Sequence, residues 1–336
     1  MFFSKKLKKI ALGLTAVIAA GMIAGCGGGN KPADSSGAKK QAKVGIVQLV
    51  EHSALDAANK GFVEGLKKRG WEEGKNVTYD RQNAQADQSN LQNIAQRFVN
   101  NKADLIYAIA TPAAQTVANV TSTIPIVGSA ITDYESAKLV ASNSKPGRNV
   151  TGTSDMNPIK EQIDLLIKLC PKAKTIGSIY CSSEVNSEIQ IKAMKAYAES
   201  KGLKVETATI STVNDIHQAA QSLIGKVDAF YEPTDNVISS AMPTLASITT
   251  EAKKPVIVGE PNQVKNGGLA TYGIDYYKLG VQSGDMAADI LDGKKKPADM
   301  PIQTAKELKV TINQKNADAL GIKIPDDVLK GAEIIK

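Results

Sequence analysis

Small hydroxyl and carboxylate side chains gather in six short segments of this chain, and each segment follows an apolar run typical of a β-strand. Such groups donate and accept hydrogen bonds without bulk, which suits recognition of a small polar ligand. Because the carboxyl ends of parallel strands meet at one edge of a sheet, we expect these segments to line one site. They are Glu51-His52-Ser53, Thr111-Pro112-Ala113-Ala114, Thr132-Asp133-Tyr134, Thr153-Ser154-Asp155, Ser182-Ser183-Glu184 and Pro233-Thr234-Asp235-Asn236.

The elements that must position these segments follow from hydrophobic periodicity. Short apolar runs such as residues 44–49 alternate with longer amphipathic stretches such as residues 53–69, where Leu55, Phe62 and Leu66 share one helical face. Strands that are apolar throughout, and that alternate with helices, indicate parallel sheets covered by helices on both faces.

This alternation occurs twice along the chain. Val44-Gly45-Ile46-Val47 matches Ile176-Gly177-Ser178-Ile179, and Asp104-Leu105-Ile106-Tyr107 matches Asp228-Ala229-Phe230-Tyr231. Glycines 70 and 202 form a third matching pair before strands, and Pro125 and Pro255 form a fourth inside similar apolar runs. The similar offsets predict an α/β protein with two similar doubly wound parallel-sheet lobes instead of one long sheet.

The first 26 residues resemble the leader of a bacterial lipoprotein. Lysines 5, 6, 8 and 9 precede an apolar stretch at residues 10–24, which is too short for a stable bilayer span of about 20 residues. Small residues then lead to Cys26. We therefore predict a signal peptide at 1–25, lipid on Cys26, a flexible tether at 26–42, and an extracytoplasmic body anchored to the cell membrane.

Charge and composition exclude several classes of protein. Removal of the leader takes away four lysines and lowers the net charge from +7 to +3, so we expect no nucleic-acid partner. Two histidines and three cysteines without metal-ligand spacing predict no metal, and we read Cys170 and Cys181 as reduced. Catalysis would need a nucleophile and a base to meet, as Ser53 and His52 would, but no GxSxG or phosphate-binding motif is present. We expect no enzyme, no catalytic residue and no cofactor.

Seven motifs of the chain are informative in combination: Glu51-His52-Ser53-Ala54-Leu55-Asp56, Gln82-Asn83-Ala84, Asp87-Gln88-Ser89-Asn90-Leu91, Ala108-Ile109-Ala110-Thr111-Pro112-Ala113-Ala114-Gln115, Asn149-Val150-Thr151-Gly152, Pro233-Thr234-Asp235-Asn236 and Leu269-Ala270-Thr271-Tyr272-Gly273-Ile274-Asp275-Tyr276-Tyr277. Together they resemble one family, the ABC-transporter solute-binding lipoproteins of the tryptophan/tyrosine-uptake type, with the type I periplasmic-binding-protein fold. The resemblance covers residues 43 to about 325.

The resemblance implies capture of an amino acid, most often an aromatic one, and its delivery to a membrane permease driven by an ATPase, with the binding protein acting as a monomer. Two other functions of the same fold stay open. One is a ligand sensor that presents its closed form to a membrane receptor, and the other is a binding protein for another small carboxylate, a sugar or a nucleoside. An adhesin or scaffold would not need a ligand cleft.

The resemblance also implies three crossovers between the lobes, which we place near residues 148, 273 and 303. The first lobe then takes residues 43–148 plus 274–303, and the second takes 149–273 plus 304–336. Three connections across one cleft form a hinge, and closure around the ligand is the expected motion.

An amino acid presents a carboxylate, which favours the amides at a helix N-terminus together with a hydroxyl. In the first lobe, Thr111 with the amides of Ala113 and Ala114 matches that requirement, although Thr111 is also a plausible helix cap. In the second lobe, Ser182 and Ser183 precede a predicted helix in the same way.

The ligand ammonium requires a desolvated carboxylate. We favour Asp235, between Thr234 and Asn236, over its alternative role as a plain helix cap. Asp275 and Asp155 are the other two candidates, and Asp275 also stands where it would cap the following helix.

The remaining candidates would contact the body of the ligand. Glu51, His52 and Ser53 follow the first strand, so we include them as binding residues. Tyr134 stands where relatives often have proline, and it is expected to reshape the pocket or to face a ligand ring.

Overall fold

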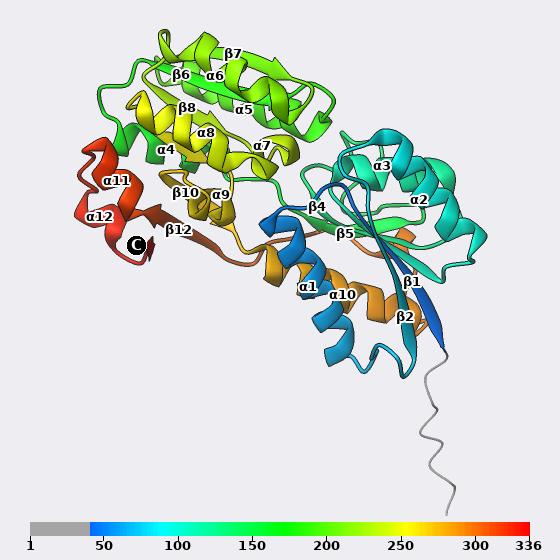
Figure 1. The fold of residues 1–336 in the computed structure, drawn as a ribbon. Coiled ribbons are helices and arrows are strands. Elements are labelled where there is room, and N and C mark those ends of the chain that lie inside the picture. Colours follow the sequence, from blue (N-terminus) through cyan, green and yellow to red (C-terminus); the bar gives the residue numbers. More distant parts are fainter. Residues whose placement is uncertain (1–40) are drawn as a thin grey trace, which may run out of the picture. The chain divides into compact units, whose positions relative to one another are not determined.

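Two sheets organise the chain, and a computed structural model describes them over residues 41–336 (Figure 1). The predicted signal peptide 1–25, Cys26 and nearly all of the predicted tether lie outside the described residues. Within residues 41–336, no helix is long and apolar enough to cross a membrane. Cys170 and Cys181 are both free thiols.

The first sheet has the strand order β11-β5-β4-β3-β1-β2, and every neighbouring pair is parallel. Helices of the same lobe cover it. The elements are β1 (Ala42–Gln48), α1 (Ser53–Lys68), β2 (Val77–Asn83), α2 (Gln88–Asn100), β3 (Leu105–Ile109), α3 (Thr111–Val120), β4 (Ile126–Ile131), β5 (Val150–Ser154), α10 (Tyr276–Leu291), η2 (Pro297–Asp299) and β11 (Gln303–Thr304).

The second sheet has the order β13-β12-β10-β9-β8-β6-β7, and only the β10–β12 pair is antiparallel. Its elements are α4 (Ile159–Leu169), β6 (Thr175–Cys181), α5 (Val185–Ser200), β7 (Lys204–Ile210), η1 (Val213–Asp215), α6 (Ile216–Ile224), β8 (Ala229–Glu232), α7 (Asn236–Ser240), α8 (Met242–Glu251), β9 (Val256–Val258), α9 (Pro261–Lys265), β10 (Ala270–Ile274), β12 (Leu308–Asn313), α11 (Gln314–Leu320), α12 (Asp326–Leu329) and β13 (Glu333–Ile335).

The two sheets repeat one topology, as the matching sequence segments predicted. The run β4-β3-β1-β2 in the first sheet corresponds to β9-β8-β6-β7 in the second. In both, the strand order reverses beside the first strand of the repeat, between β1 and β3 and between β6 and β8. Such a reversal leaves a crevice at the carboxyl ends of the two central strands, where ligands of doubly wound folds bind.

The chain passes between the sheets three times, and the first passage lies later than the sequence suggested. Residues 150–154 form β5, which pairs with β4 in the first sheet, so the chain leaves this lobe after Ser154 instead of near residue 148. The second passage follows Ile274, and the third follows β11, at Thr304. Asp155 therefore lies on a crossover, and not inside the second lobe.

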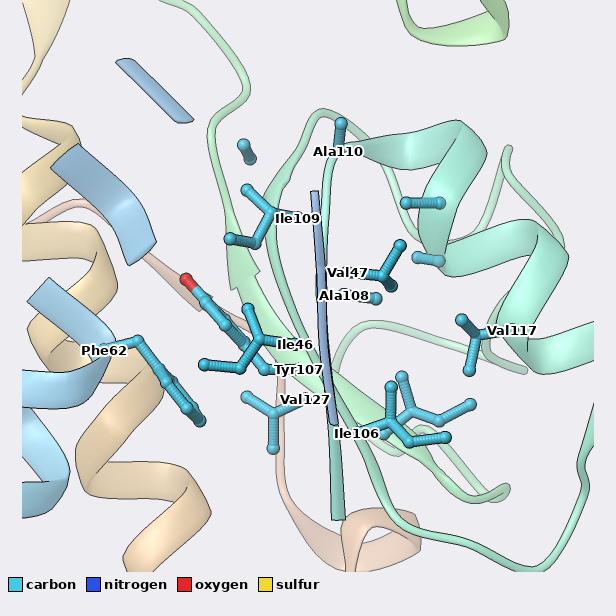
Figure 2. Packing of buried hydrophobic residues seen from close by; sticks show 14 of the residues in the cluster. Ile46, Val47, Phe62, Ile106, Tyr107, Ala108, Ile109, Ala110, Val117 and Val127 are labelled. Carbon is cyan, nitrogen blue, oxygen red and sulfur yellow. The ribbon is translucent and has the colours of Figure 1, made fainter. Parts of the chain in front are cut away.

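The core of the first lobe shows why apolar runs without alternation became strands. Successive residues of β3 point to opposite faces of the sheet, and both faces are covered. Figure 2 shows Tyr107 toward Phe62 of α1, whereas Ala108 and Val117 lie on the α3 face. The Phe62 and Tyr107 rings are stacked with centroids 3.7 Å apart. All of these side chains are buried.

Glycines bring α1 and α10 into backbone contact. The two helices pack against each other along their lengths (Figure 1). A Cβ added to Gly280 would overlap the carbonyl of Ala58, and one added to Gly61 would overlap the carbonyl of Tyr277. Only glycine permits so close an approach of the two backbones.

Candidate functional site

A groove of about 650 Å³ lies between the loops at the carboxyl ends of both sheets. Its volume is within the range of pockets that hold small organic ligands. The first lobe contributes residues that follow β1, β2 and β3, and the second contributes residues that follow β6, β7 and β8. The lining residues are Leu49, Val50, Glu51, Asn83, Gln85, Ala86, Asp87, Gln88, Leu91, Pro112, Ser183, Glu184, Ser211, Thr212, Val213, Val237 and Ser240.

Three hydrogen bonds join side chains of the two lobes. His52 Nε2 pairs with Asn236 Oδ1 at 3.3 Å, and Gln190 Nε2 donates to Thr132 Oγ1 at 3.4 Å. Asn266 Nδ2 donates to the hydroxyl of Ser53 at 3.5 Å. Burial of the imidazole lowers the pKa of His52 to about 4, so His52 contacts the second lobe as a neutral ring at physiological pH. These bonds help to hold the lobes together.

A buried polar network continues from these contacts into the second lobe. Gln190 Nε2 donates to Thr234 Oγ1 at 2.8 Å and to the carbonyl of Asn186 at 3.2 Å. Gln190 Oε1 accepts from Asn157 Nδ2 at 2.9 Å. Buried amides are retained only when most of their donors find partners. Here the donors are paired, but Oδ1 of Asn157 and Oδ1 of Asn186 have no hydrogen-bond partner among the described residues.

Asp235, which the sequence favoured for the ligand ammonium, is occupied by protein donors. Its Oδ2 accepts from the amide of Cys181 and from the hydroxyl of Ser187, both at 2.7 Å, and its Oδ1 accepts from the amide of Ile238 at 2.9 Å. The side chain is fully buried and caps α7. Both oxygens of Asp235 thus have protein donors, and the side chain acts as a helix cap.

Glu184 is a second buried carboxylate in the same region. It accepts hydrogen bonds from the amides of Asn236 and Val237 and from Asn186 Nδ2. Burial, reinforced by the nearby carboxylate of Asp235, raises the pKa of Glu184 to about 8. Glu184 therefore links the groove, which it lines, to the helix that carries Asn236.

Asp155 is a buried carboxyl group of which one oxygen is hydrogen-bonded and the other is not. The carboxyl group is 2% exposed, and its Oδ2 accepts a short hydrogen bond from the hydroxyl of Tyr276. Its Oδ1 has no hydrogen-bond partner within residues 41–336. Burial raises the pKa of Asp155 to about 6, so the group is mostly ionised at pH 7. An ionised oxygen held away from water and left unpaired suits a ligand cation.

Thr111, in the first lobe, is another buried residue with a polar atom that has no hydrogen-bond partner among the described residues. It begins α3, is 1% exposed, and its hydroxyl has no partner among the residues described. The preceding Ala110 has φ 85°, a conformation that alanine rarely adopts and that marks strain at the entrance to the helix. The amide of Ala114 donates to the carbonyl of Ala110, so it is used inside the helix. The hydroxyl of Thr111 is the group left for a carboxylate.

The other predicted residues divide between the groove and the scaffold. Glu51 and Ser183 line the groove, and Ser182 lies exposed beside it, whereas Ala113 is buried in α3. Tyr134 is buried in the core of the first lobe, where its hydroxyl donates to the carbonyl of Thr153. Asp275 is exposed, and its side chain caps α10 through the amide of Lys278.

Sequence reasoning missed Asn157, Asn186, Gln190 and Tyr276. Asn186 and Gln190 could have been recognised from the sequence, because they are polar residues on the inward face of α5. Such a face is normally apolar. Asn157 and Tyr276 gave none, since their role depends on partners more than 30 residues away.

Comparisons with known proteins agree with this geometry. A sequence model described as ABC transporter substrate binding protein matches residues 43–336. The chain belongs to this family. The "Tyrosine-binding protein" of Clostridioides difficile (strain R20291) is 44% identical over 339 residues, covering 98% of this chain and 96% of that protein. The family binds solutes for ABC transporters outside the cytoplasm and is not a family of enzymes.

Two solved structures of similar identity differ in how well this chain superposes on them. An ABC domain from Streptococcus pneumonia in complex with L-Trp is 43% identical, with TM-score 0.85, covering 88% of this chain and all of that one. A ligand-free, open substrate-binding protein with adhesive properties from Clostridium difficile is 45% identical, with TM-score 0.68, covering 88% and 99%. This chain therefore superposes more closely on the tryptophan complex than on the ligand-free, open structure.

A weaker likeness extends to sugar-binding relatives of the same fold. A glucose-galactose binding protein from Geobacillus stearothermophilus is 18% identical with TM-score 0.59, covering 81% of this chain and 97% of that protein. At this identity the likeness shows the type I periplasmic-binding-protein fold alone. In residues 41–336, no group of three or more His, Cys, Asp or Glu residues is placed to hold a metal ion.

Proposed function

We propose that this substrate-binding protein captures an L-amino acid with an aromatic side chain between its lobes and delivers it to an ABC permease. The observation that carries the proposal is the free, buried Oδ1 of Asp155 on a crossover between the lobes. An ammonium group supplies the charge and the N–H donors that this oxygen lacks. Oδ1 of Asn157, two residues along the chain, is a second acceptor for the same group.

The ligand carboxylate is assigned to the N-terminus of α3. The hydroxyl of Thr111 is buried and without a partner in the described chain, and it is a donor at the positive end of a helix dipole. The strained conformation of Ala110 sets where α3 begins and so where this hydroxyl points. Thr111 and Asp155 together would bind both charges of a zwitterion.

The ligand side chain is assigned to the groove. Apolar side chains make up much of its wall, namely Leu49, Val50, Leu91, Pro112, Val213 and Val237. An aromatic ring buries a large apolar area against such walls, and its one polar atom can still find a partner. The tyrosine-binding relative and the tryptophan complex described above support an aromatic ligand.

Calorimetry with amino acids and two truncated analogues tests this proposal. We expect L-Trp and L-Tyr to bind the purified protein, unfolded and refolded to strip carried ligand, with micromolar or tighter affinity. Tryptamine lacks the carboxylate and indole-3-propionate lacks the ammonium, so each is expected to bind at least about tenfold more weakly. Tight binding of a sugar or a nucleoside, with no response to amino acids, would overturn the proposal.

Lipid anchoring belongs to the same proposal and rests on the leader pattern that ends at Cys26. An anchored binding protein stays close to its permease, which raises the effective ligand supply at the membrane. In a bacterial host fed labelled palmitate, we expect the wild-type protein to carry label and to fractionate with membranes. Cys26→Ser should carry none. Equal labelling of both proteins, or of neither, would contradict an anchor at Cys26.

A further inference from the structure

Asn186 presents a buried polar atom that the head-group assignment above does not use. The residue lies in the first turn of α5, directly beyond the carboxyl end of β6, and is 3% exposed. Its Nδ2 donates to Oε2 of Glu184 at 2.9 Å and to the carbonyl of Thr234 at 3.3 Å. Its Oδ1 has no partner among residues 41–336.

The orientation of this amide follows from its neighbours. A carbonyl oxygen can only accept, and the carbonyl of Thr234 lies 3.3 Å from Nδ2. A flipped amide would point Oδ1 at this carbonyl oxygen and would lose the hydrogen bond. The unpaired atom of Asn186 is therefore an acceptor, and whatever occupies the site must bring a donor to it.

The position of Asn186 separates this acceptor from the ammonium site. Asp155 lies on the first crossover against Tyr276, whereas Asn186 lies at the start of α5 against Glu184, which lines the groove. Helix α5 contacts α3 of the other lobe, and Gln190, one turn beyond Asn186, donates to Thr132 of that lobe. Asn157, two residues beyond Asp155, donates to Gln190 Oε1, and Gln190 Nε2 donates to the carbonyl of Asn186, so one chain of hydrogen bonds connects the two sites.

We propose that Asn186 determines specificity within this site by accepting a hydrogen bond from a donor on the ligand ring, the phenol O–H of tyrosine or the indole N–H of tryptophan. The inference rests on the proposed amino-acid function and deepens it. Phenylalanine fills the same space without a donor, so its binding would leave a buried acceptor unpaired. Sites built to pair with a substrate hydroxyl reject the analogue that lacks it.

A comparison of L-Tyr with L-Phe on the full chain, by calorimetry, tests the inference. We expect wild-type protein to bind L-Phe about 10- to 100-fold more weakly than L-Tyr. In Asn186→Leu the acceptor is absent, and the ratio should fall to about threefold or less. Lys192→Leu places the same side chain on an exposed position of α5 and should keep the wild-type ratio.

The outcomes separate the inference from the function on which it rests. Equal wild-type affinities for L-Tyr and L-Phe would overturn the role of Asn186 and leave aromatic amino-acid binding intact. A large ratio that persists in Asn186→Leu would also overturn it. Failure of every aromatic amino acid to bind would overturn both. If Asn186→Leu does not fold, the wild-type ratio and that of Asn186→Ala decide.

Discussion

Gly280→Ala is expected to lower the free energy of unfolding by about 3 kcal/mol or more, because its new methyl group would overlap the carbonyl oxygen of Ala58. Backbone atoms cannot move aside as a flexible side chain can, so α1 and α10 would have to separate. Their separation would also open the stacked pair of Phe62 and Tyr107 to rearrangement. The close-packed structure around Gly280 has little space in which to relax around the added methyl group.

Urea and thermal unfolding of purified protein measure this effect. The expected loss corresponds to a fall of about 5–10 °C in the melting temperature of a chain of this size. Gly225→Ala is the matched control, because Gly225 ends α6 in an ordinary right-handed conformation and a Cβ there meets nothing within 4 Å. We expect it to stay within about 0.5 kcal/mol of wild type. A Gly280→Ala protein as stable as Gly225→Ala would contradict the close backbone contact.

The same substitution connects stability to the ligand site. Helix α10 begins with Tyr276, whose hydroxyl holds one oxygen of Asp155, and α1 begins beside His52, which contacts Asn236 in the other lobe. The glycine contact therefore joins two elements that carry site residues at their ends. A displaced α10 should weaken ligand binding as well as folding.

Local patterns were sufficient to predict most of the architecture. The strand at residues 44–49 and the helix at 53–69 were each placed within two residues of β1 and α1, since periodicity and burial are properties of the segment itself. The repeat predicted two lobes for the same reason. The first crossover was misplaced because β5 is short and partly polar, and only its pairing with β4 assigns it to the first sheet.

The candidate site was predictable as a set of loops but not as a set of contacts. Asp235 and Asp155 both follow strands, and nothing local distinguishes them. The donors that occupy Asp235 come from Cys181 and Ser187, about 50 residues earlier in the chain. Tyr134 looked like a ligand-facing ring for the same reason, although its hydroxyl bonds to Thr153 inside the core. Which acceptor stays free is a property of the folded chain.

Asp155→Asn is expected to weaken binding of L-Trp or L-Tyr by about 100-fold at pH 7, because it replaces the proposed charge partner of the ammonium by a neutral amide. The variant should still fold, since its oxygen can keep the hydrogen bond from Tyr276. Asp235→Asn is the matched comparison. It should lower the free energy of unfolding, because it removes an acceptor from buried donors. The folded fraction of this variant should lose less ligand affinity than Asp155→Asn does. Calorimetry on both variants separates the two roles.

The pH dependence of ligand affinity provides a second, independent test of the role of Asp155. Burial raises its pKa to about 6 in the ligand-free protein, and the proposed ammonium contact needs the ionised form. The contribution of Asp155 to affinity should therefore be constant above about pH 7 and fall about tenfold for each pH unit below about 5. The neutral His52, with a pKa near 4, does not titrate between pH 5 and 7, whereas Glu184 and Glu260, with pKa values raised to about 8 and 7, can add to the wild-type profile.

The Asp155→Asn variant isolates the contribution of this one carboxyl group. Its affinity should lose the acid-side fall, because no proton competes with the ligand at residue 155. The sign for folding is opposite: a carboxyl group with a pKa raised above its unfolded value of 3.8 destabilises the ligand-free fold as pH rises toward 6. Asp155→Asn without ligand should thus unfold at a higher temperature than wild type at pH 7. An affinity profile with the same acid-side fall in both proteins would assign the ammonium contact to another group.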